Sequence, residues 1–146
     1  YSFMDNTYKF NSLDEPSFPS NYNITHALTL GTAYTKNRFK VSAGFNWHSG
    51  KPTTEPIFGN EIVNNEVNFG AANNQSLEDY LRLDISAIYD LKFCHHVNAT
   101  IGLSVWNVLD KENIINSFYS VQDQNLLKTN QQSLAITPNA FIRVYF

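Results

Sequence analysis

The sequence predicts an all-β chain that forms an antiparallel segment of a transmembrane β-barrel with about six strands. Two observations predict this fold. Apolar and polar residues alternate along several stretches of the chain, which is the period of a strand that has one apolar face. The connections between these stretches are in turn long, short, long, short and long, as expected when tight turns lie on one side of a membrane and long loops on the other.

The alternation is clearest in residues 39–48, where every odd position is apolar and every even position is polar or Gly. Residues 81–89 and 99–105 follow the same pattern, with one exception at Ile88. Helical periodicity is nearly absent from the chain. Weaker alternation in three further stretches brings the predicted strands to six: residues 1–10, 28–34 and 140–146.

The sequence predicts tight turns at residues 35–38 and 90–96, and long connections at residues 11–21, 49–79 and 109–133. Six strands are too few to close a bacterial barrel, which has an even number of at least about eight. Two explanations stay open. In the first, further strands precede this segment in a longer protein, which also fits a chain that begins at Tyr1 without a leader. In the second, residues 61–69 and residues 114–121 form a further pair of strands.

The composition argues against several other classes of protein. Hydrophobic residues make up 42% of the chain and aromatic residues 14%, which argues against disorder. The net charge is −3, with ten Lys and Arg scattered among thirteen Asp and Glu, so no nucleic-acid partner is expected. The single Cys94 cannot form an internal disulfide. No apolar run approaches the roughly 20 residues of a membrane helix, but a membrane strand needs only about 9 to 11.

One face of the predicted strands is expected to meet lipid. The opposite face carries charged and hydrogen-bonding residues, which a dry core would exclude and a water-filled barrel interior accommodates. Trp106 has the parity of this polar face unless a bulge redirects it. The residues predicted to face lipid are Val41, Phe45, Leu83, Ile85, Ile101, Leu103, Val105, Ile142 and Val144.

Four short elements resemble TonB-dependent outer-membrane receptors of the Bacteroidota type. Residues 105–111, V-W-N-V-L-D-K, resemble the N-[VLI]-[FL]-[DN]-[KR] element that precedes the last extracellular loop of that family, and residues 137–141, T-P-N-A-F, resemble the opening of its final strand. Residues 23–31 and 49–56 resemble its D-x-T-H-x-L-x-L and S-G-x-P-x-T elements, with Asn23 in place of the acidic residue. These elements follow the expected order over nearly the whole chain.

The last residue, Phe146, follows Val144 and Ile142 on the same predicted face. This ending is similar to the C-terminal signal that the barrel-assembly machinery recognises. Phe141 stands where that signal prefers Gly, and Val144 where it prefers an aromatic residue. Phe146 is therefore the candidate assembly residue.

The resemblance implies that residues 1–146 are the C-terminal part of a large, plugged barrel of roughly 22 strands. The plug and the segment that contacts TonB would be N-terminal to these residues and are not present in them. The implied function is active uptake of a bulky nutrient, such as an iron chelate, a vitamin or an oligosaccharide, across the bacterial outer membrane, with no cofactor. The implied partners are the lipid bilayer, the TonB complex, the barrel-assembly machinery and, as a further candidate, a surface lipoprotein.

Four residues are candidates for contact with ligand or plug. Arg82 and Asp84 share the polar face two positions apart, where an ion pair within the wall is the favoured interpretation over ligand contact. His48 and Lys51 lie where a strand enters a long loop; substrate would first be met there, although solvated loop residues are the simpler explanation.

Neither a metal site nor catalysis is expected. His95 and His96 are adjacent, so their side chains point in different directions and are not expected to share a metal. No spacing assembles a nucleophile, a base and an orienting acid. A pair of carboxylates such as Glu61 and Glu66 is the remaining route to an enzyme.

Two other classes of protein stay open. One is a self-contained eight-stranded barrel that acts as an adhesin or an envelope anchor, for which a signal peptide directly before Tyr1 would be expected. The other is a soluble β-sandwich that binds a glycan or a protein, for which the isolated chain would fold as a monomer without detergent.

Overall fold

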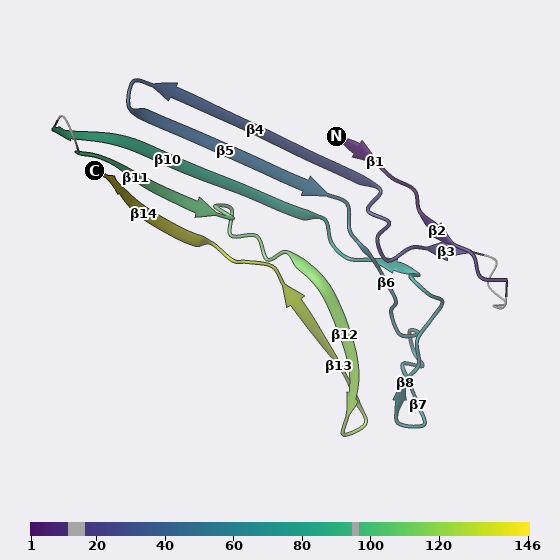
Figure 1. The fold of residues 1–146 in the computed structure, drawn as a ribbon. Coiled ribbons are helices and arrows are strands. Elements are labelled where there is room, and N and C mark those ends of the chain that lie inside the picture. Colours follow the sequence, from purple (N-terminus) through teal and green to yellow (C-terminus); the bar gives the residue numbers. More distant parts are fainter. Residues whose placement is uncertain (12–16, 95–96) are drawn as a thin grey trace. The chain divides into compact units, whose positions relative to one another are not determined.

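The computed structural model describes residues 1–11, 17–94 and 97–146. These residues form strands and no helix (Figure 1), which confirms the all-β prediction. In the described part of the chain there is consequently no helix that could cross a membrane. The strands are β1 (Ser2–Phe3), β2 (Thr7–Tyr8), β3 (Phe18–Pro19), β4 (His26–Lys36), β5 (Phe39–His48), β6 (Pro52–Thr53), β7 (Ile62–Val63), β8 (Glu66–Val67), β9 (Gln75–Ser76), β10 (Tyr80–Cys94), β11 (Val97–Trp106), β12 (Ile114–Gln122), β13 (Asn125–Gln132) and β14 (Thr137–Tyr145).

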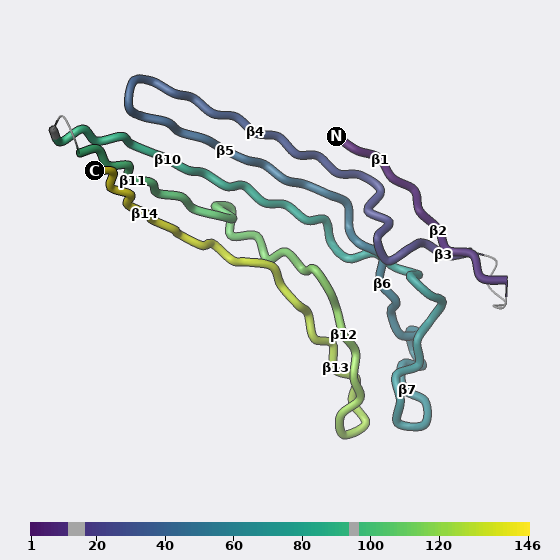
Figure 2. Tube along the Cα trace, in the orientation of Figure 1, coloured from purple at the N-terminus to yellow at the C-terminus, as the bar shows by residue number. Residues whose placement is uncertain are grey.

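Six of these strands form one sheet in the order β1-β4-β5-β10-β11-β14. The pairs β1–β4, β10–β11 and β11–β14 are antiparallel, and Figure 2 shows the five long strands running side by side. Each of the six predicted strands contributes one member. Residues 1–10 contribute only the short β1, because Thr7 and Tyr8 pair instead with β3.

The strand register places the alternating apolar residues on one face of the sheet. Ile85 lies opposite Val105, and Ile101 lies opposite Ile142. Residues directly opposite each other in a ladder point to the same side. This apolar face contains Val41, Phe45, Leu83, Ile85, Tyr89, Ile101, Leu103, Val105, Ile142 and Val144.

The other side of the sheet, the polar face, carries the residues between them. Ser42 and Ser86 meet there, with their hydroxyl oxygens 2.7 Å apart. Trp106 also lies on this face, because the β11–β14 register continues without a bulge to the pair Trp106 and Thr137. The remaining members include Lys40, Asn46, Arg82, Asp84, Thr100, Ser104 and Arg143.

The described part of the chain has almost no apolar core. Ala99 is its only buried hydrophobic residue, 2% exposed. The apolar face stays open instead: the exposed fraction is 59% for Leu103 and 68% for Ile142. A contiguous exposed apolar surface of this kind marks contact with a partner or a membrane rather than with water.

The predicted turn at residues 90–96 is wrong for most of its length. β10 continues to Cys94, and the Asp90 carboxylate accepts a hydrogen bond from the Thr100 hydroxyl on the next strand at 2.7 Å. Polar residues here continue the polar face rather than end the strand. His95 and His96 lie outside the described residues, as do residues 12–16 of the first long connection.

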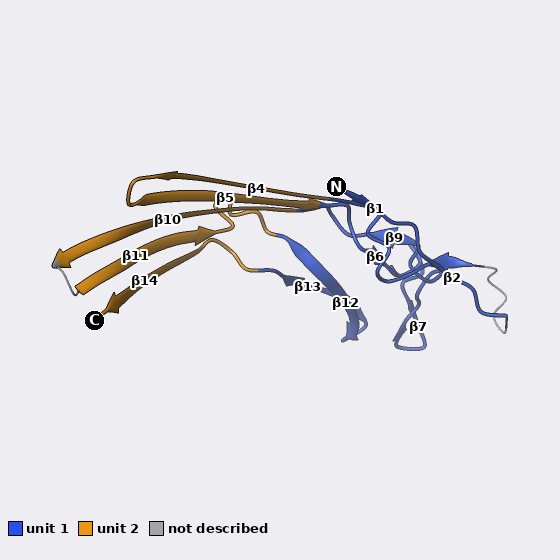
Figure 3. Ribbon diagram, turned by 45° about the horizontal axis from the view of Figure 1, so that its top comes forward, with its two compact units in different colours: residues 1–27, 48–80, 113–133 blue, residues 28–47, 81–112, 134–146 orange. Residues whose placement is uncertain are grey.

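The chain divides into two compact units, coloured separately in Figure 3. Unit 2 holds most of β4, β5, β10, β11 and β14, whereas unit 1 holds the N-terminal segment and most of two long connections. Unit 1 comprises residues 1–27, 48–80 and 113–133, and unit 2 comprises residues 28–47, 81–112 and 134–146.

Two of the long connections contain hairpins that the alternation did not predict. β7 pairs with β8 across Asn64-Asn65, and β12 pairs with β13 across Asp123-Gln124. All four turn residues have positive φ, between 49° and 64°, as a type I′ hairpin turn requires. Residues 61–69 and 114–121 do contain strands, as the alternative predicted, but each segment pairs within its own hairpin and adds no strand to the six-stranded sheet.

Gly102 allows a close contact on the polar face. It lies opposite Ile88 on one neighbouring strand and Phe141 on the other, and a Cβ at this position would collide with the Phe141 ring. We expect Gly102→Val to lower the free energy of unfolding by about 1–3 kcal/mol through overpacking, although Val favours strands. Urea unfolding of the native protein and of the variant measures this loss. The double variant with Phe141→Ala should recover most of it, and an unchanged single variant would contradict the contact.

Candidate functional site

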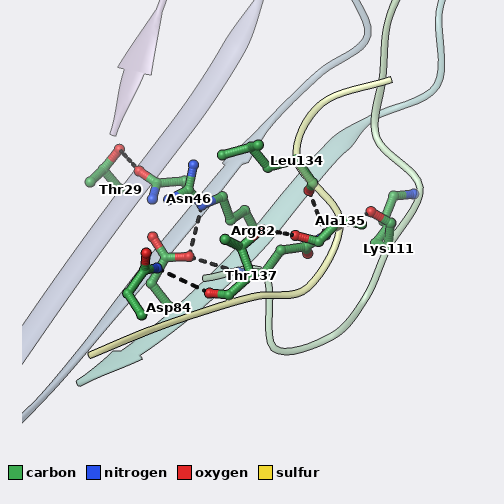
Figure 4. A network of polar contacts seen from close by, with 10 residues as sticks. Thr29, Asn46, Arg82, Asp84, Lys111, Leu134, Ala135 and Thr137 are labelled. Carbon is green, nitrogen blue, oxygen red and sulfur yellow. Dashed lines mark hydrogen bonds and ion pairs between the residues drawn. The ribbon is translucent and has the colours of Figure 1, made fainter. Parts of the chain in front are cut away.

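The predicted ion pair between Arg82 and Asp84 is present on the polar face of unit 2. The Arg82 Nε donates to Asp84 Oδ1 at 2.7 Å, and both side chains are about one quarter exposed, at 23% and 25%. The same carboxylate oxygen accepts the backbone N–H of Asn107 at 3.0 Å. The Arg82 guanidinium lies 5.4 Å from the centre of the Trp106 ring. These contacts hold Arg82 and Asp84 in place on the sheet (Figure 4).

A shallow depression of about 500 Å³ lies beside this ion pair on the polar face. Small residues form most of its floor, and Asp84 and Trp106 supply its charge and its ring. Nearby, the Thr29 hydroxyl donates to Asn46 Oδ1 at 3.2 Å (Figure 4). The depression is lined by Gly31, Thr32, Ala33, Ser42, Ala43, Gly44, Asp84, Ile85, Ser86, Ser104 and Trp106.

Asn107 organises the end of β11 and the return of the chain toward β14. Its side chain is fully buried, and its Nδ2 donates to the backbone oxygens of Lys111 and Leu134, each at 3.0 Å. It has a φ of 52°, a left-handed conformation that Asn tolerates better than most residues. Asp110 accepts the N–H of Ile136 at 3.0 Å. The Asn107 and Asp110 side chains thereby link the start of the β11–β14 connection to its end.

His48 and Lys51 belong to unit 1, where they have different surroundings. The His48 ring stacks on Tyr80 with a centroid distance of 4.8 Å, and its Nδ1 donates to the Ser49 backbone oxygen at 2.8 Å. Lys51 lines a groove. Position 50, between them, has room only for Gly, because a Cβ there would collide with the Leu77 backbone oxygen. The chain is therefore closely packed at the S-G-K-P element, where it leaves β5 and enters the long connection.

The groove beside Lys51 has a volume of about 380 Å³ and is formed entirely within unit 1. Residues of the two long connections make up most of its lining, and Asn21 comes from the N-terminal segment. The lining is Asn21, Lys51, Pro52, Thr53, Thr54, Phe69, Asn73, Asn116, Ser117, Phe118 and Tyr119.

Glu55 links the two long connections beside this groove. Its Oε1 accepts hydrogen bonds from Tyr119 Oη at 3.0 Å and from Lys128 Nζ at 3.1 Å. Lys128 also lies 5.4 Å from the centre of the Tyr119 ring, and Phe69 meets that ring edge-on at 6.2 Å. We refer to Glu55, Tyr119 and Lys128 as the loop clamp.

The loop clamp changes the ionisation of its charged members. The hydrogen bond from Lys128, followed by that from Tyr119, lowers the pKa of the Glu55 carboxyl below its ordinary value of 4.5. Hydrogen bonds to Tyr119 and to Glu55 raise the pKa of Lys128. Because the folded pKa of Glu55 is depressed, the clamp contributes stability above pH 4.5 and loses it only as the pH falls through the lower, folded pKa.

We expect Glu55→Gln to loosen the β12–β13 hairpin. The rate of amide hydrogen exchange in this hairpin, corrected for intrinsic rates, should rise about two- to five-fold at pH 7. The rise is small because a partly exposed ion pair contributes less than about 1 kcal/mol. Hydrogen exchange followed by mass spectrometry measures this change. In the native protein the protection should persist at pH 5 and fall below pH 4.5. Glu78→Gln, at an exposed position of the same unit, is the control, and an equal effect there would contradict the role of Glu55.

Sequence reasoning missed the loop clamp and the role of Asn107. Glu55 and Lys128 are 73 residues apart, and neither has a neighbour in the sequence that marks it. Asn107 was singled out only as part of a motif. Of the two carboxylates weighed for catalysis, Glu61 accepts the N–H of Gly59 at 2.8 Å, and Glu66 belongs to β8. Within the described residues, no group of His, Cys, Asp and Glu could hold a metal ion.

Comparisons with known proteins give no relative: no family model matches the chain, and neither a curated protein nor a solved structure does.

Proposed function

We propose that this chain is the C-terminal part of the β-barrel of a TonB-dependent receptor, which takes up a bulky nutrient across the outer membrane of a bacterium. The observation that carries the proposal is the open apolar face of the sheet. Within the described residues, its alternating Leu, Ile, Val and Phe side chains are not buried in an apolar core, and the polar face on the other side of the sheet carries charged residues. A lipid-facing wall with a wet interior accounts for both faces.

The lengths of the connections between the strands support the same proposal. Two-residue connections join β4 to β5 and β10 to β11, whereas long connections join β5 to β10 and β11 to β14. In an antiparallel sheet the long connections leave the strands at the ends opposite to the short ones. In the proposed receptor the short connections are periplasmic and the long connections are extracellular.

The proposed partners follow from this placement. The apolar face contacts the lipid bilayer, and the terminal strand with Phe146 is recognised by the barrel-assembly machinery. An N-terminal plug contacts the TonB complex, and Arg82 and Asp84 are the proposed contacts with the plug on the polar face. A surface lipoprotein is a further candidate partner at the extracellular loops.

Fractionation of the native cell envelope tests the proposal. The intact protein should sediment with the outer membrane and should migrate faster on a gel before heating than after it, as folded barrels do. Deletion of its gene and deletion of tonB should cause the same growth defect on the transported nutrient. A protein that is soluble and monomeric without detergent would contradict the proposal and favour a β-sandwich.

A further inference from the structure

We propose that the groove of unit 1 binds a neutral, polyhydroxylated ligand, namely an oligosaccharide. This inference rests on the proposed uptake function and names its substrate class. The groove volume of about 380 Å³ falls within the range of about 300–1,000 Å³ that is typical of small-molecule sites. Its lining combines three kinds of group, each of which fits one feature of a sugar.

Side-chain amides and hydroxyls supply the first fit. Three Asn amides and three Ser and Thr hydroxyls line the groove. An amide both donates and accepts hydrogen bonds, as each sugar hydroxyl does, so neighbouring hydroxyls of a sugar ring can be bound in pairs. These polar residues are Asn21, Asn73, Asn116, Thr53, Thr54 and Ser117.

Internal hydrogen bonds hold these amides in fixed orientations. Asn73 Nδ2 donates to Asn21 Oδ1 at 2.6 Å and to the Pro19 backbone oxygen at 2.7 Å, which leaves Asn73 Oδ1 as an acceptor for a ligand. Asn116 Oδ1 accepts the N–H of Ser117 at 3.1 Å, which leaves the Asn116 amide protons as donors. The groove thus presents oriented donors and acceptors before a ligand arrives, which lowers the entropic cost of binding.

Aromatic rings supply the second fit. Phe118 is 53% exposed and Phe69 is 48% exposed, and both line the groove. The negative face of an aromatic ring attracts the C–H groups on one side of a sugar ring. Exposed rings beside oriented amides therefore match the two kinds of surface that a sugar presents.

The third fit is the low charge of the groove, which argues against an anionic iron chelate as the ligand. Among the described residues, Lys51 is the only charged one in the lining. The nearby Lys128 is neutralised by Glu55 in the loop clamp. A ferric chelate with several negative charges would require several cations to offset its desolvation, whereas a neutral sugar requires none.

Calorimetric titration of the intact, detergent-purified protein tests this inference. The probes are maltohexaose, xylohexaose and laminarihexaose, with ferric citrate as the anionic comparison. We expect at least one hexasaccharide to bind, and Phe118→Ala to weaken its binding at least about ten-fold, in line with the loss of one stacking contact. Asn116→Ala should weaken it by a smaller factor.

The matched control is Phe58→Ala, which removes a ring that is 97% exposed and lies outside the groove in the same unit. Its affinity should equal that of the native protein, and a heat-modifiability gel should show that all variants are folded. Binding of ferric citrate alone, binding of no probe, or equal affinity in Phe118→Ala would overturn the inference. A folded barrel in the outer membrane that binds no sugar would leave the uptake proposal intact, whereas a protein absent from that membrane would overturn the uptake proposal itself.

Discussion

The substitution Leu103→Arg is expected to block assembly of the protein into the outer membrane, whereas Ser104→Arg at the next position is expected to be tolerated. Both residues lie in β11, on opposite faces of the sheet. Leu103 is 59% exposed on the apolar face, and an Arg facing the bilayer midplane costs about 2–4 kcal/mol. Ser104 lies opposite Ser86 on the polar face, where an added charge would meet water.

The amount of heat-modifiable protein in the outer-membrane fraction measures this difference. Leu103→Phe is the control for size, because it changes the side chain without adding charge and should assemble normally. An equal loss of assembled protein in Leu103→Arg and Ser104→Arg would contradict the assignment of the two faces.

The substitution Asn107→Ala is expected to lower the free energy of unfolding by about 2–4 kcal/mol. It would leave the backbone oxygens of Lys111 and Leu134 without the amide that binds them, and an unsatisfied buried polar group costs about 1–3 kcal/mol. Ala also tolerates the φ of 52° poorly. Urea unfolding in phospholipid vesicles measures this loss.

Asn107→Gly separates the two causes. Gly adopts positive φ without strain but offers no side-chain amide, so its loss should be about 1 kcal/mol smaller than that of Ala. If Asn107→Ala were as stable as the native protein, the two hydrogen bonds would not be what joins β11 to the start of β14.

The long strands could be predicted because their alternation is a local property of the sequence. Residues 39–48 and 99–105 alternate almost without exception, and both lie within strands. The end of β10 was missed because Ile88 interrupts the alternation and Asp90 resembles a turn residue. In the sheet Ile88 lies opposite Gly102 within a continuous β10–β11 ladder.

The β12–β13 hairpin could not be predicted from its composition. Residues 125–132 contain Asn, Lys, Thr and Gln, several of which are uncommon in strands, and the turn residues Asp123 and Gln124 are not the Asn-Gly or Asp-Gly pair that marks a type I′ turn. This hairpin is stabilised by its own ladder and by the loop clamp, and both contacts depend on the fold rather than on periodicity.

The candidate site was predictable only where its members are close in sequence. Arg82 and Asp84 are two positions apart on one strand, so their pairing follows from strand geometry. The groove of unit 1 draws on segments near residues 21, 52, 73 and 117, which only the folded connections bring together. The lipid-facing role of the apolar face stays a prediction.

Site-directed spin labelling at Leu103→Cys and Ser104→Cys, in a Cys94→Ser background of the intact protein in lipid vesicles, tests the central claim most directly. Relaxation by oxygen reports contact with acyl chains, and relaxation by a water-soluble nickel chelate reports contact with water. The label at position 103 should respond mainly to oxygen, and the label at position 104 mainly to nickel. A label at position 103 that neither reagent reaches would place the apolar face in a dry protein core and contradict the account.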